Sequence, residues 1–565
     1  MSRNLLTVVG AFAASVLLVV LQRRIRSFRM ALRVSRSLHA ESRAGAVSLE
    51  RYAAFDRRMG SLSADSVLDE RTWDDLHLAA VFRHCDHTAS QVGRQMLYHT
   101  LRRAALTPTE ALMFDARARA FDADPVVAGQ VRAVLSTLQD PAAADLETAC
   151  FGELPPRPWF WWIFPLLSVG AAVTLIGGAW WPTLWIGALA IGVCNMIAQM
   201  FYRPRVAPLL PALRDMPNFL RTSAQLGRIP LPTLVQECDT LRMGVTRLRA
   251  VGTATRWLRV DALGGNELAN SIQEYVNILF LLDLNAFVFA VETLRAERAL
   301  LQAMFRSMGA IDVALSVASW RAERGAWSTP TFTPPTKQLR ARAMQHPLVR
   351  DCVPNDLAVA DQSLLITGSN MSGKTTFIRA LAVNVVLAQA LATVCAEEWH
   401  APVLRVRTSI GLSDSLLEGK SYYLAEIESV RRMIDAKAEG TQHLFVIDEL
   451  FRGTNTNERV AAAIATLSWL NRGDDLVAVA THDLEVFKPL GSHYAAYHFR
   501  EQLDASTLSF DYRLYPGLSS TTNAIALLEA LHFPDELIAH ARSALGPGPA
   551  SVTNRRGLTV TNHPG

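Results

Sequence analysis

The residues with the clearest chemical purpose lie in the last third of the chain, where a glycine-rich segment follows an apolar run. Residues 368–375 read Gly-Ser-Asn-Met-Ser-Gly-Lys-Thr and fit the pattern G-x-x-x-x-G-K-[ST]. Its glycines let the backbone turn so that N–H groups face phosphate oxygens, helped by the positive end of the following helix. In such a loop Lys374 contacts the β- and γ-phosphates, and the Thr375 hydroxyl binds Mg²⁺. The predicted cofactors are ATP and Mg²⁺, and the predicted nucleotide-binding residues are Gly368, Ser369, Asn370, Met371, Ser372, Gly373, Lys374, Thr375 and Thr376.

A second apolar run ends in two carboxylates. Leu444 to Ile447 predicts a buried strand that brings Asp448 and Glu449 to its carboxyl end, the edge where parallel sheets bind ligands. Asp448 is suited to hold Mg²⁺ together with Thr375, and Glu449 to orient or deprotonate the attacking water. Taken alone, such a strand end is more often solvated than catalytic. The phosphate-binding loop upstream reverses that preference and makes Glu449 a candidate catalytic residue.

A third apolar run, Val477 to Ala480, ends in Thr481-His482-Asp483. We expect another buried strand whose end brings His482 to the same edge of the sheet, where it could sense the γ-phosphate. A lone histidine is more often structural, and its position at a strand end favours the catalytic interpretation here.

Two long apolar stretches explain why half of the residues are hydrophobic and why the mean hydropathy is +0.15. Residues 158–202 carry no charge, which is too long for one membrane span and suits two, with the turn at Trp180-Trp181-Pro182. Residues 5–21 are uncharged and precede an arginine cluster, as in an uncleaved anchor rather than a secretory signal. The positive flanks favour an inner (cytoplasmic) membrane, multi-pass location with the C-terminal domain in the cytoplasm. The alternative for 158–202 is a buried hairpin of a soluble protein.

Composition divides the remaining chain. Apolar positions recur at intervals of three and four up to about residue 325, which predicts helices, and a Pro- and Thr-rich linker follows before short β-rich runs alternate with helices. We therefore expect an α/β P-loop NTPase domain of the ABC-like type, preceded by an all-α core with three predicted transmembrane helices. The expected segments are 1–33, a transmembrane anchor with a basic flank; 34–156, the first part of the helical core; 157–205, a transmembrane hairpin; 206–335, the second part of the core; 336–545, the ATPase domain; and 546–565, a disordered tail.

These motifs together resemble the MutS family of DNA mismatch-repair ATPases. The loop carries that family's Asn370-Met371 pair, Phe451 to Thr456 is similar to its G-R-G-T-S-T stretch, and Thr481-His482 matches its T-H pair. His346 to Val349 matches the family's H-P-x-V, and Glu418 to Glu426 its G-R-S-T-F-x-x-E signature. More weakly, Asp86 to Leu97 resembles the opening of the family's helical core, and Gly309 to Leu315 resembles its close.

The resemblance implies a homodimer with composite ATP sites, in which Ser421 reaches the γ-phosphate held by the other subunit, and it adds Lys374 and Ser421 to the catalytic candidates Glu449 and His482. It implies action on double-stranded DNA, although we expect no counterpart of the family's mismatch-reading N-terminal domain. The stretch Cys352 to Asn355 is the candidate neighbourhood of the adenine. The membrane is a further expected partner.

Other function classes fit less well. An ABC-type transporter would need more than three spans and an L-S-G-G-Q signature before Asp448, which the chain lacks. A nucleotide-gated membrane scaffold that does not act on DNA remains open, although Lys374, Thr375, Asp448 and Glu449 together argue against a degenerate site. The arginines at 23–36 could contact DNA or, more typically, anionic lipid. Six scattered cysteines without a C-x-x-C pair exclude a disulfide framework and a zinc site.

Overall fold

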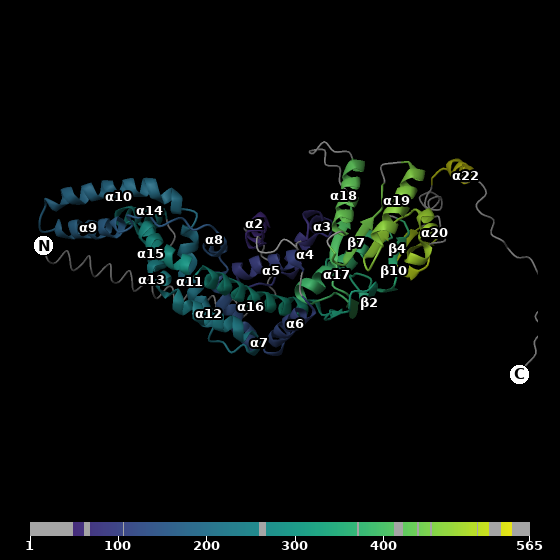
Figure 1. Ribbon diagram of the computed structural model, residues 1–565, viewed down its shortest axis with the longest axis horizontal. Coiled ribbons are helices and arrows are strands. Elements are labelled where there is room, and N and C mark those ends of the chain that lie inside the picture. The colour runs from purple at the N-terminus through teal and green to yellow at the C-terminus, as the bar shows by residue number, and fades with distance from the viewer. Residues whose placement is uncertain are drawn as a thin grey trace, which may run out of the picture.

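The computed structural model describes residues 49–60, 68–104, 107–258, 267–369, 372–411, 422–437, 440–451, 455–504, 507–518 and 533–544. The molecule is elongated, with a helical arm at one end and a domain of sheets and helices at the other (Figure 1). The expected anchor at 1–33 and the expected disordered tail at 546–565 lie outside the described residues.

The arm is built from helices alone, as the periodicity predicts. Local signals start several of them: Thr107 and Glu110 form a capping box ahead of Pro108, and Ser90 caps the helix that begins at Gln91. The α-helices of the arm are α2 (Leu49–Gly60), α3 (Glu70–Asp75), α4 (Leu78–Cys85), α5 (Gln91–Arg103), α6 (Pro108–Ala123), α7 (Pro125–Leu135), α8 (Leu146–Phe151), α9 (Ile163–Gly177), α10 (Leu184–Val206), α11 (Leu210–Leu226), α12 (Val235–Arg247), α13 (Arg249–Thr255), α14 (Glu267–Phe280), α15 (Leu282–Ala296) and α16 (Arg298–Arg324).

Helix α16 runs along the arm towards the sheets. Where it packs against the start of α5, it contributes a buried carboxylate. Asp312 accepts hydrogen bonds from the N–H groups of Ala89 and Ser90, both at 2.8 Å, and from the Ser90 hydroxyl at 2.6 Å. Burial raises the pKa of Asp312 to about 6, against the lowering effect of these hydrogen bonds. A Cβ atom on Gly93 would lie 2.0 Å from the carboxylate, so this crossing requires glycine. The two family-like segments of the arm therefore meet at one joint.

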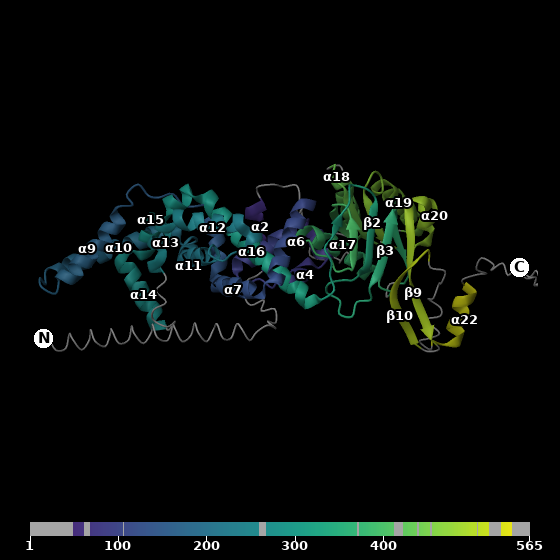
Figure 2. The ribbon, with the colours of Figure 1, turned by 90° about the horizontal axis from the view of Figure 1, so that it is seen from below.

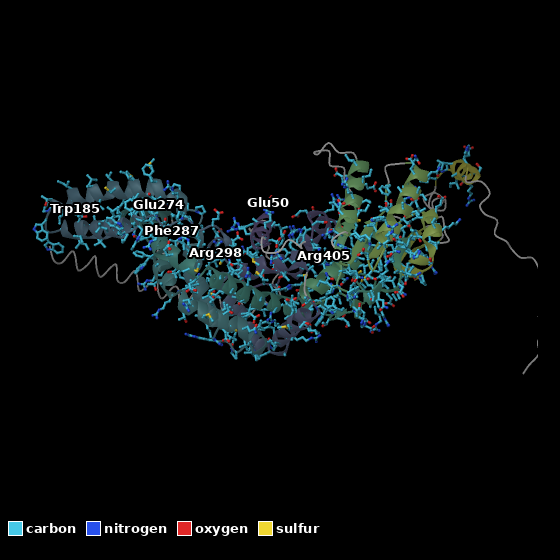
Figure 3. All side chains as sticks on the ribbon, in the orientation of Figure 1. Glu50, Trp185, Glu274, Phe287, Arg298 and Arg405 are labelled. Carbon is cyan, nitrogen blue, oxygen red and sulfur yellow. The ribbon has the colours of Figure 1, made fainter. Side chains whose placement is uncertain are left out.

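Helices α9 and α10 form the expected hairpin, with the turn at residues 178–183. Among the described residues three helices are long and apolar enough to cross a membrane, namely α10, α16 and α17 (Lys374–Leu391), while α9 has 15 residues and falls short of that length. The apolar window is 67% buried inside the protein for α16 and 83% for α17, but 17% for α10. Side chains on the hairpin, including the labelled Trp185, project outward (Figure 3). Of these three helices, α10 is therefore the one whose apolar surface the other described residues leave largely uncovered.

The apolar periodicity of the second part of the helical core continues from Ser271 to Met308, but these residues do not form one helix. It breaks at Leu281, which has a φ of 48°, and the helices on either side are bent by 62°. The break frees backbone carbonyls, and the hairpin supplies donors to them: Asn195 donates to the carbonyl of Leu279 at 2.6 Å and Gln199 to that of Asn277 at 3.4 Å. The polar face that Asn195 and Gln199 share on α10 thus holds the hairpin against the arm.

The C-terminal domain contains two sheets (Figure 2). A four-stranded sheet has the order β1 (Thr331–Phe332), β5 (Glu398–Ala401), β2 (Gln338–Met344), β3 (Asn355–Ala360). A six-stranded sheet has the order β10 (Thr507–Pro516), β9 (Tyr494–Asp504), β4 (Ser363–Thr367), β8 (Leu476–Ala480), β7 (His443–Asp448), β6 (Arg405–Ser409). All neighbouring strands of this second sheet are parallel except the β10–β9 pair.

Helices cover both faces of the six-stranded sheet. Side chains of β4, β7 and β8 alternate between α17 on one face and the helices α18 (Tyr422–Lys437) and α19 (Thr456–Leu470) on the other. Because both faces are buried, these strands are continuous apolar runs, as the sequence predicts for a parallel sheet. The short helix α20 (Phe487–Leu490) and the C-terminal α22 (Asp535–Ala544) complete the described domain. The observed architecture is thus a mixed α/β domain behind a helical region.

Candidate nucleotide-binding site

Three central strands bring the predicted polar residues to one edge of the sheet. Strands β4, β8 and β7 are neighbours, and Ala480 pairs with both Ile366 and Asp448. Because the strands are parallel, the loop after Thr367, the carboxylates after Ile447 and the loop after Ala480 emerge side by side. The sheet topology therefore assembles the three sequence motifs into one site.

The glycine-rich loop joins β4 to α17, the position that a phosphate-binding loop requires. Gly368 and Gly373 have φ values of 133° and 102°, in the range that L side chains rarely adopt. Lys374 is 2% exposed, and its Nζ donates to the carbonyls of Gly368 at 2.6 Å and Ser369 at 2.7 Å. The lysine thus lies folded back over its own loop.

The predicted magnesium ligands are in direct contact. Thr375 Oγ1, in the first turn of α17, donates to Asp448 Oδ2 at the end of β7 at 2.7 Å. Among the described residues no group of three or more His, Cys, Asp or Glu side chains could hold a metal by itself. Thr375 and Asp448 are the residues that would hold a magnesium ion, which would supply positive charge beside bound phosphates.

Glu449 follows Asp448 in a strained backbone conformation and meets the predicted histidine. Its φ is 57°, its N–H donates to the carbonyl of Ala480 at 2.9 Å, and the residue is 6% exposed. The distance between Glu449 Oε1 and His482 Nδ1 is 3.2 Å, and the His482 side chain is 50% exposed. A non-glycine residue at positive φ costs energy, and such strain is found where a side chain must point in one direction.

Several predicted site residues are not part of this constellation. Asn370, Met371 and Ser421 lie outside the described residues. Thr376 is exposed on the first turn of α17, and Ser372 uses its hydroxyl to donate to the carbonyl of Ser369 at 2.8 Å. The structure therefore brings together Lys374, Thr375, Asp448, Glu449 and His482 of the predicted set.

In the family-like segment His346 to Val349, the histidine has a local structural contact. His346 is buried, and burial lowers its pKa to about 4, so the ring is neutral near pH 7. Its Nδ1 accepts a hydrogen bond from the N–H of Leu348 at 3.2 Å. This histidine shapes a turn ahead of β3.

Two features around the candidate site have no signal in the sequence. A Cβ atom on Gly373 would lie 3.2 Å from Tyr512 Cδ1, which places this tyrosine of β10 beside the loop. The carbonyl of Tyr512 accepts a hydrogen bond from Asn355 Nδ2 at 3.0 Å, so the predicted adenine neighbourhood and β10 are adjacent. The second feature is an ion pair between Arg459 of α19 and Asp483, with two N–O distances of 3.0 Å.

The residues present fit a magnesium nucleotide. The Ser369 hydroxyl is buried and has no hydrogen-bond partner within the part of the chain that the structure describes. The glycines leave the loop without Cβ atoms at its two ends, and the loop lies at the N-terminus of the 18-residue α17. An unsatisfied donor, an open loop and a helix N-terminus are the features that bind phosphate.

Comparisons with known proteins agree with this geometry. Residues 364–546 match the family model of MutS domain V. The chain is 35% identical over 212 residues to the DNA mismatch repair protein MutS of Thermus aquaticus, covering 37% of this chain and 26% of that protein. It is 32% identical over 263 residues to MutS of Thermus thermophilus, covering 46% of this chain and 32% of that protein. It is 30% identical over 276 residues to MutS of an Exiguobacterium species, covering 47% of this chain and 32% of that protein.

These matches concern one part of the molecule. The matched segment spans about a third of the length of these curated relatives or less. It contains β4, β7 and β8 and all three motifs of the site. MutS domain V is a P-loop ATPase-type domain, and residues 364–546 of this chain are similar to it.

Proposed function

We propose that this protein is a Mg²⁺-dependent ATP hydrolase. The observation that carries the proposal is the 2.7 Å contact between Thr375 and Asp448, with Glu449 at the end of the same strand. A hydroxyl in the first turn of the helix after the loop and a carboxylate at a strand end are the pair that holds magnesium in P-loop ATPases. A magnesium ion bound there would neutralise charge on the β- and γ-phosphates.

Lys374, Glu449 and His482 each have a distinct role in this proposal. Lys374 exchanges the carbonyls of Gly368 and Ser369 for phosphate oxygens when ATP binds, because both interactions satisfy the same ammonium group. Glu449 accepts a proton from, or orients, the attacking water, while His482 contacts its carboxylate. Steady-state hydrolysis of ATP by the purified protein tests the proposal directly.

Replacing Lys374 by Ala should abolish stable nucleotide retention. The variant loses the cation that faces the β- and γ-phosphates, an interaction with a charged group worth about 1.5–3 kcal/mol or more, so the ATP affinity should fall at least about tenfold. Equilibrium binding of a fluorescent ATP analogue with Mg²⁺ measures this. Lys488→Ala, on α20, is the matched control and should bind like the wild type. Unchanged binding by Lys374→Ala would contradict the proposal.

We further propose that the active form is a homodimer in which ATP binding switches the subunit contacts. The support is the likeness to MutS domain V and the family-like signature around Ser421, whose side chain would reach the γ-phosphate in the partner site. An ATP-driven switch requires that the two states of the dimer differ in affinity for nucleotide.

Double-stranded DNA is the proposed partner, because the curated relatives are DNA mismatch repair proteins. The proposal concerns ATP-dependent action on duplex DNA in repair and stops short of mismatch recognition, since the matched segment is domain V. We expect duplex affinity to fall steeply as the salt concentration rises, because contacts to phosphate release counterions. Filter binding across a salt series, with and without a non-hydrolysable ATP analogue, measures this. Affinity independent of salt, or none in either nucleotide state, would favour the nucleotide-gated scaffold instead.

The proposed location is the inner membrane, with the ATPase domain in the cytoplasm. The 23 residues of α10 extend over about 34 Å, close to the roughly 30 Å of a hydrocarbon core. Exposed tryptophans lie at both ends of the hairpin, with Trp159 and Trp162 at its base and Trp180 and Trp181 at its tip. Arg157 stacks over the Trp161 ring at the base, 3.6 Å from its centroid. The exposed apolar side chains of the hairpin helices α9 and α10 are Leu166, Val169, Val173, Ile176, Ile186, Leu189, Val193, Met196, Ile197, Met200 and Phe201.

A further inference from the structure

Four charged or ionisable side chains form a continuous row beside the candidate site. Arg459 Nε and Nη2 each lie 3.0 Å from an oxygen of Asp483. Asp483 Oδ1 is 3.7 Å from His482 Nε2, and His482 Nδ1 is 3.2 Å from Glu449 Oε1. The row therefore runs from the first turn of α19 to the carboxylate proposed to act on water.

The outer pair is more firmly held than the histidine that it contacts. The Arg459 and Asp483 side chains are both 18% exposed, and the two parallel hydrogen bonds fix the guanidinium and carboxylate planes relative to one another. His482 is half exposed and has no such bidentate partner, so its orientation depends on the groups at its two ring nitrogens.

The backbone around the pair is anchored as well. The N–H of Thr481 donates to the carbonyl of Ile366 at 3.0 Å, and the N–H of Asp483 donates to Thr481 Oγ1 at 3.0 Å. At the other side, Asn455 caps α19 by accepting a hydrogen bond from the N–H of Glu458 at 2.9 Å. The pair thus connects two fixed structural elements, the end of β8 and the start of α19.

We propose that Arg459 and Asp483 are positioning residues of the ATPase site, which hold His482 against Glu449 and so fix the direction of the Glu449 carboxylate. The inference rests on the proposed function and extends it. Among the described residues, Lys374 donates to the loop carbonyls of Gly368 and Ser369 and Thr375 donates to Asp448, whereas the Arg459 guanidinium bonds to Asp483. Loss of the pair should therefore slow hydrolysis and leave nucleotide binding intact.

The test is a double-mutant cycle with Arg459→Leu, Asp483→Asn and the double variant, measured by steady-state ATP hydrolysis. Each single variant should lower kcat by about 10–100-fold and change KM for ATP by less than about twofold. The double variant should be no slower than either single variant, because the two residues act as one unit. Asp483→Glu, which keeps the charge, should recover part of the lost kcat.

Arg340→Ala is the matched control. It removes an exposed arginine of the four-stranded sheet, which lies 3.8 Å from a carboxylate oxygen of Glu398 in that same sheet. It should hydrolyse ATP like the wild type. A wild-type kcat for Asp483→Asn, a loss expressed in KM alone, or multiplied losses in the double variant would overturn the positioning role. These outcomes differ from failure of the proposed function itself, in which the wild-type protein would already hydrolyse no ATP.

Discussion

Glu449→Gln should hydrolyse ATP at least about 100-fold more slowly than the wild type, because general base catalysis and water orientation contribute factors of about 10²–10⁴. The amide has nearly the volume of the carboxylate, so the buried environment next to Ala480 and His482 is retained. The variant keeps Lys374, Thr375 and Asp448, and its affinity for ATP should stay within about twofold of the wild type. Single-turnover hydrolysis and equilibrium nucleotide binding, measured on the same preparation, separate these two effects.

The control for this substitution is Glu485→Gln, an exposed carboxylate three residues beyond His482, which should leave kcat unchanged. If Glu449→Gln and the wild type hydrolysed ATP at equal rates, the assignment of Glu449 would be wrong. If both rates were indistinguishable from zero while nucleotide still bound, the scaffold interpretation would replace the enzyme. A variant that accumulated as an ATP-bound dimer would agree with the proposed switch.

The sequence predicts the strands that end at the candidate site well, because each motif is local. The strands at Ser363–Thr367 and His443–Asp448 contain the apolar runs Leu364 to Ile366 and Leu444 to Ile447, and such runs followed by polar residues are typical of buried parallel strands. The observed bounds of β7 and β8 agree to within one residue with the expected runs Leu444 to Ile447 and Val477 to Ala480, and the sheet order places the three strand ends side by side. The sequence alone therefore predicts that Thr375 and Asp448 lie together, and the 2.7 Å hydrogen bond between them agrees with that prediction.

The arm was predicted less completely, because its decisive contacts join residues far apart in the chain. The break at Leu281 has no proline or glycine to mark it, and the carbonyls that it frees find donors on α10, more than 75 residues earlier. The Asp312 joint links α16 to the start of α5 across 222 residues. A pattern within one helix reports which face is buried and carries no information about the partner helix.

The same reasoning explains why the Arg459–Asp483 pair was missed. Arg459 occupies an amphipathic helix and Asp483 a loop, where charged residues are ordinarily solvated. Their separation of 24 residues corresponds to no helical or strand period. The fold alone shows that the start of α19 and the end of β8 lie together. This arrangement brings Arg459, which belongs to none of the three motifs, into contact with Asp483 beside His482 and Glu449.

In lipid vesicles that contain the purified protein, Cys194 should react with a charged maleimide at least about 100-fold more slowly than a cysteine in water, because a charged reagent does not enter hydrocarbon. Cys194 is exposed on the surface of α10, whereas Cys85, Cys150, Cys238 and Cys395 are buried. It lies ten residues after Leu184, about 15 Å along the helix and so near the middle of a bilayer. The labelled fraction of Cys194, read by mass spectrometry over time, gives the rate.

The matched control is Leu112→Cys in a background of Cys352→Ser, because Leu112 is 67% exposed on α6 of the arm and Cys352 is partly accessible. This engineered thiol should be labelled rapidly in the same vesicles. Detergent does not decide the question, since it covers the same apolar surface. Labelling of Cys194 at the rate of the α6 control would show that the hairpin lies in water, and its exposed leucines, valines and tryptophans would then need a protein partner rather than lipid to cover them.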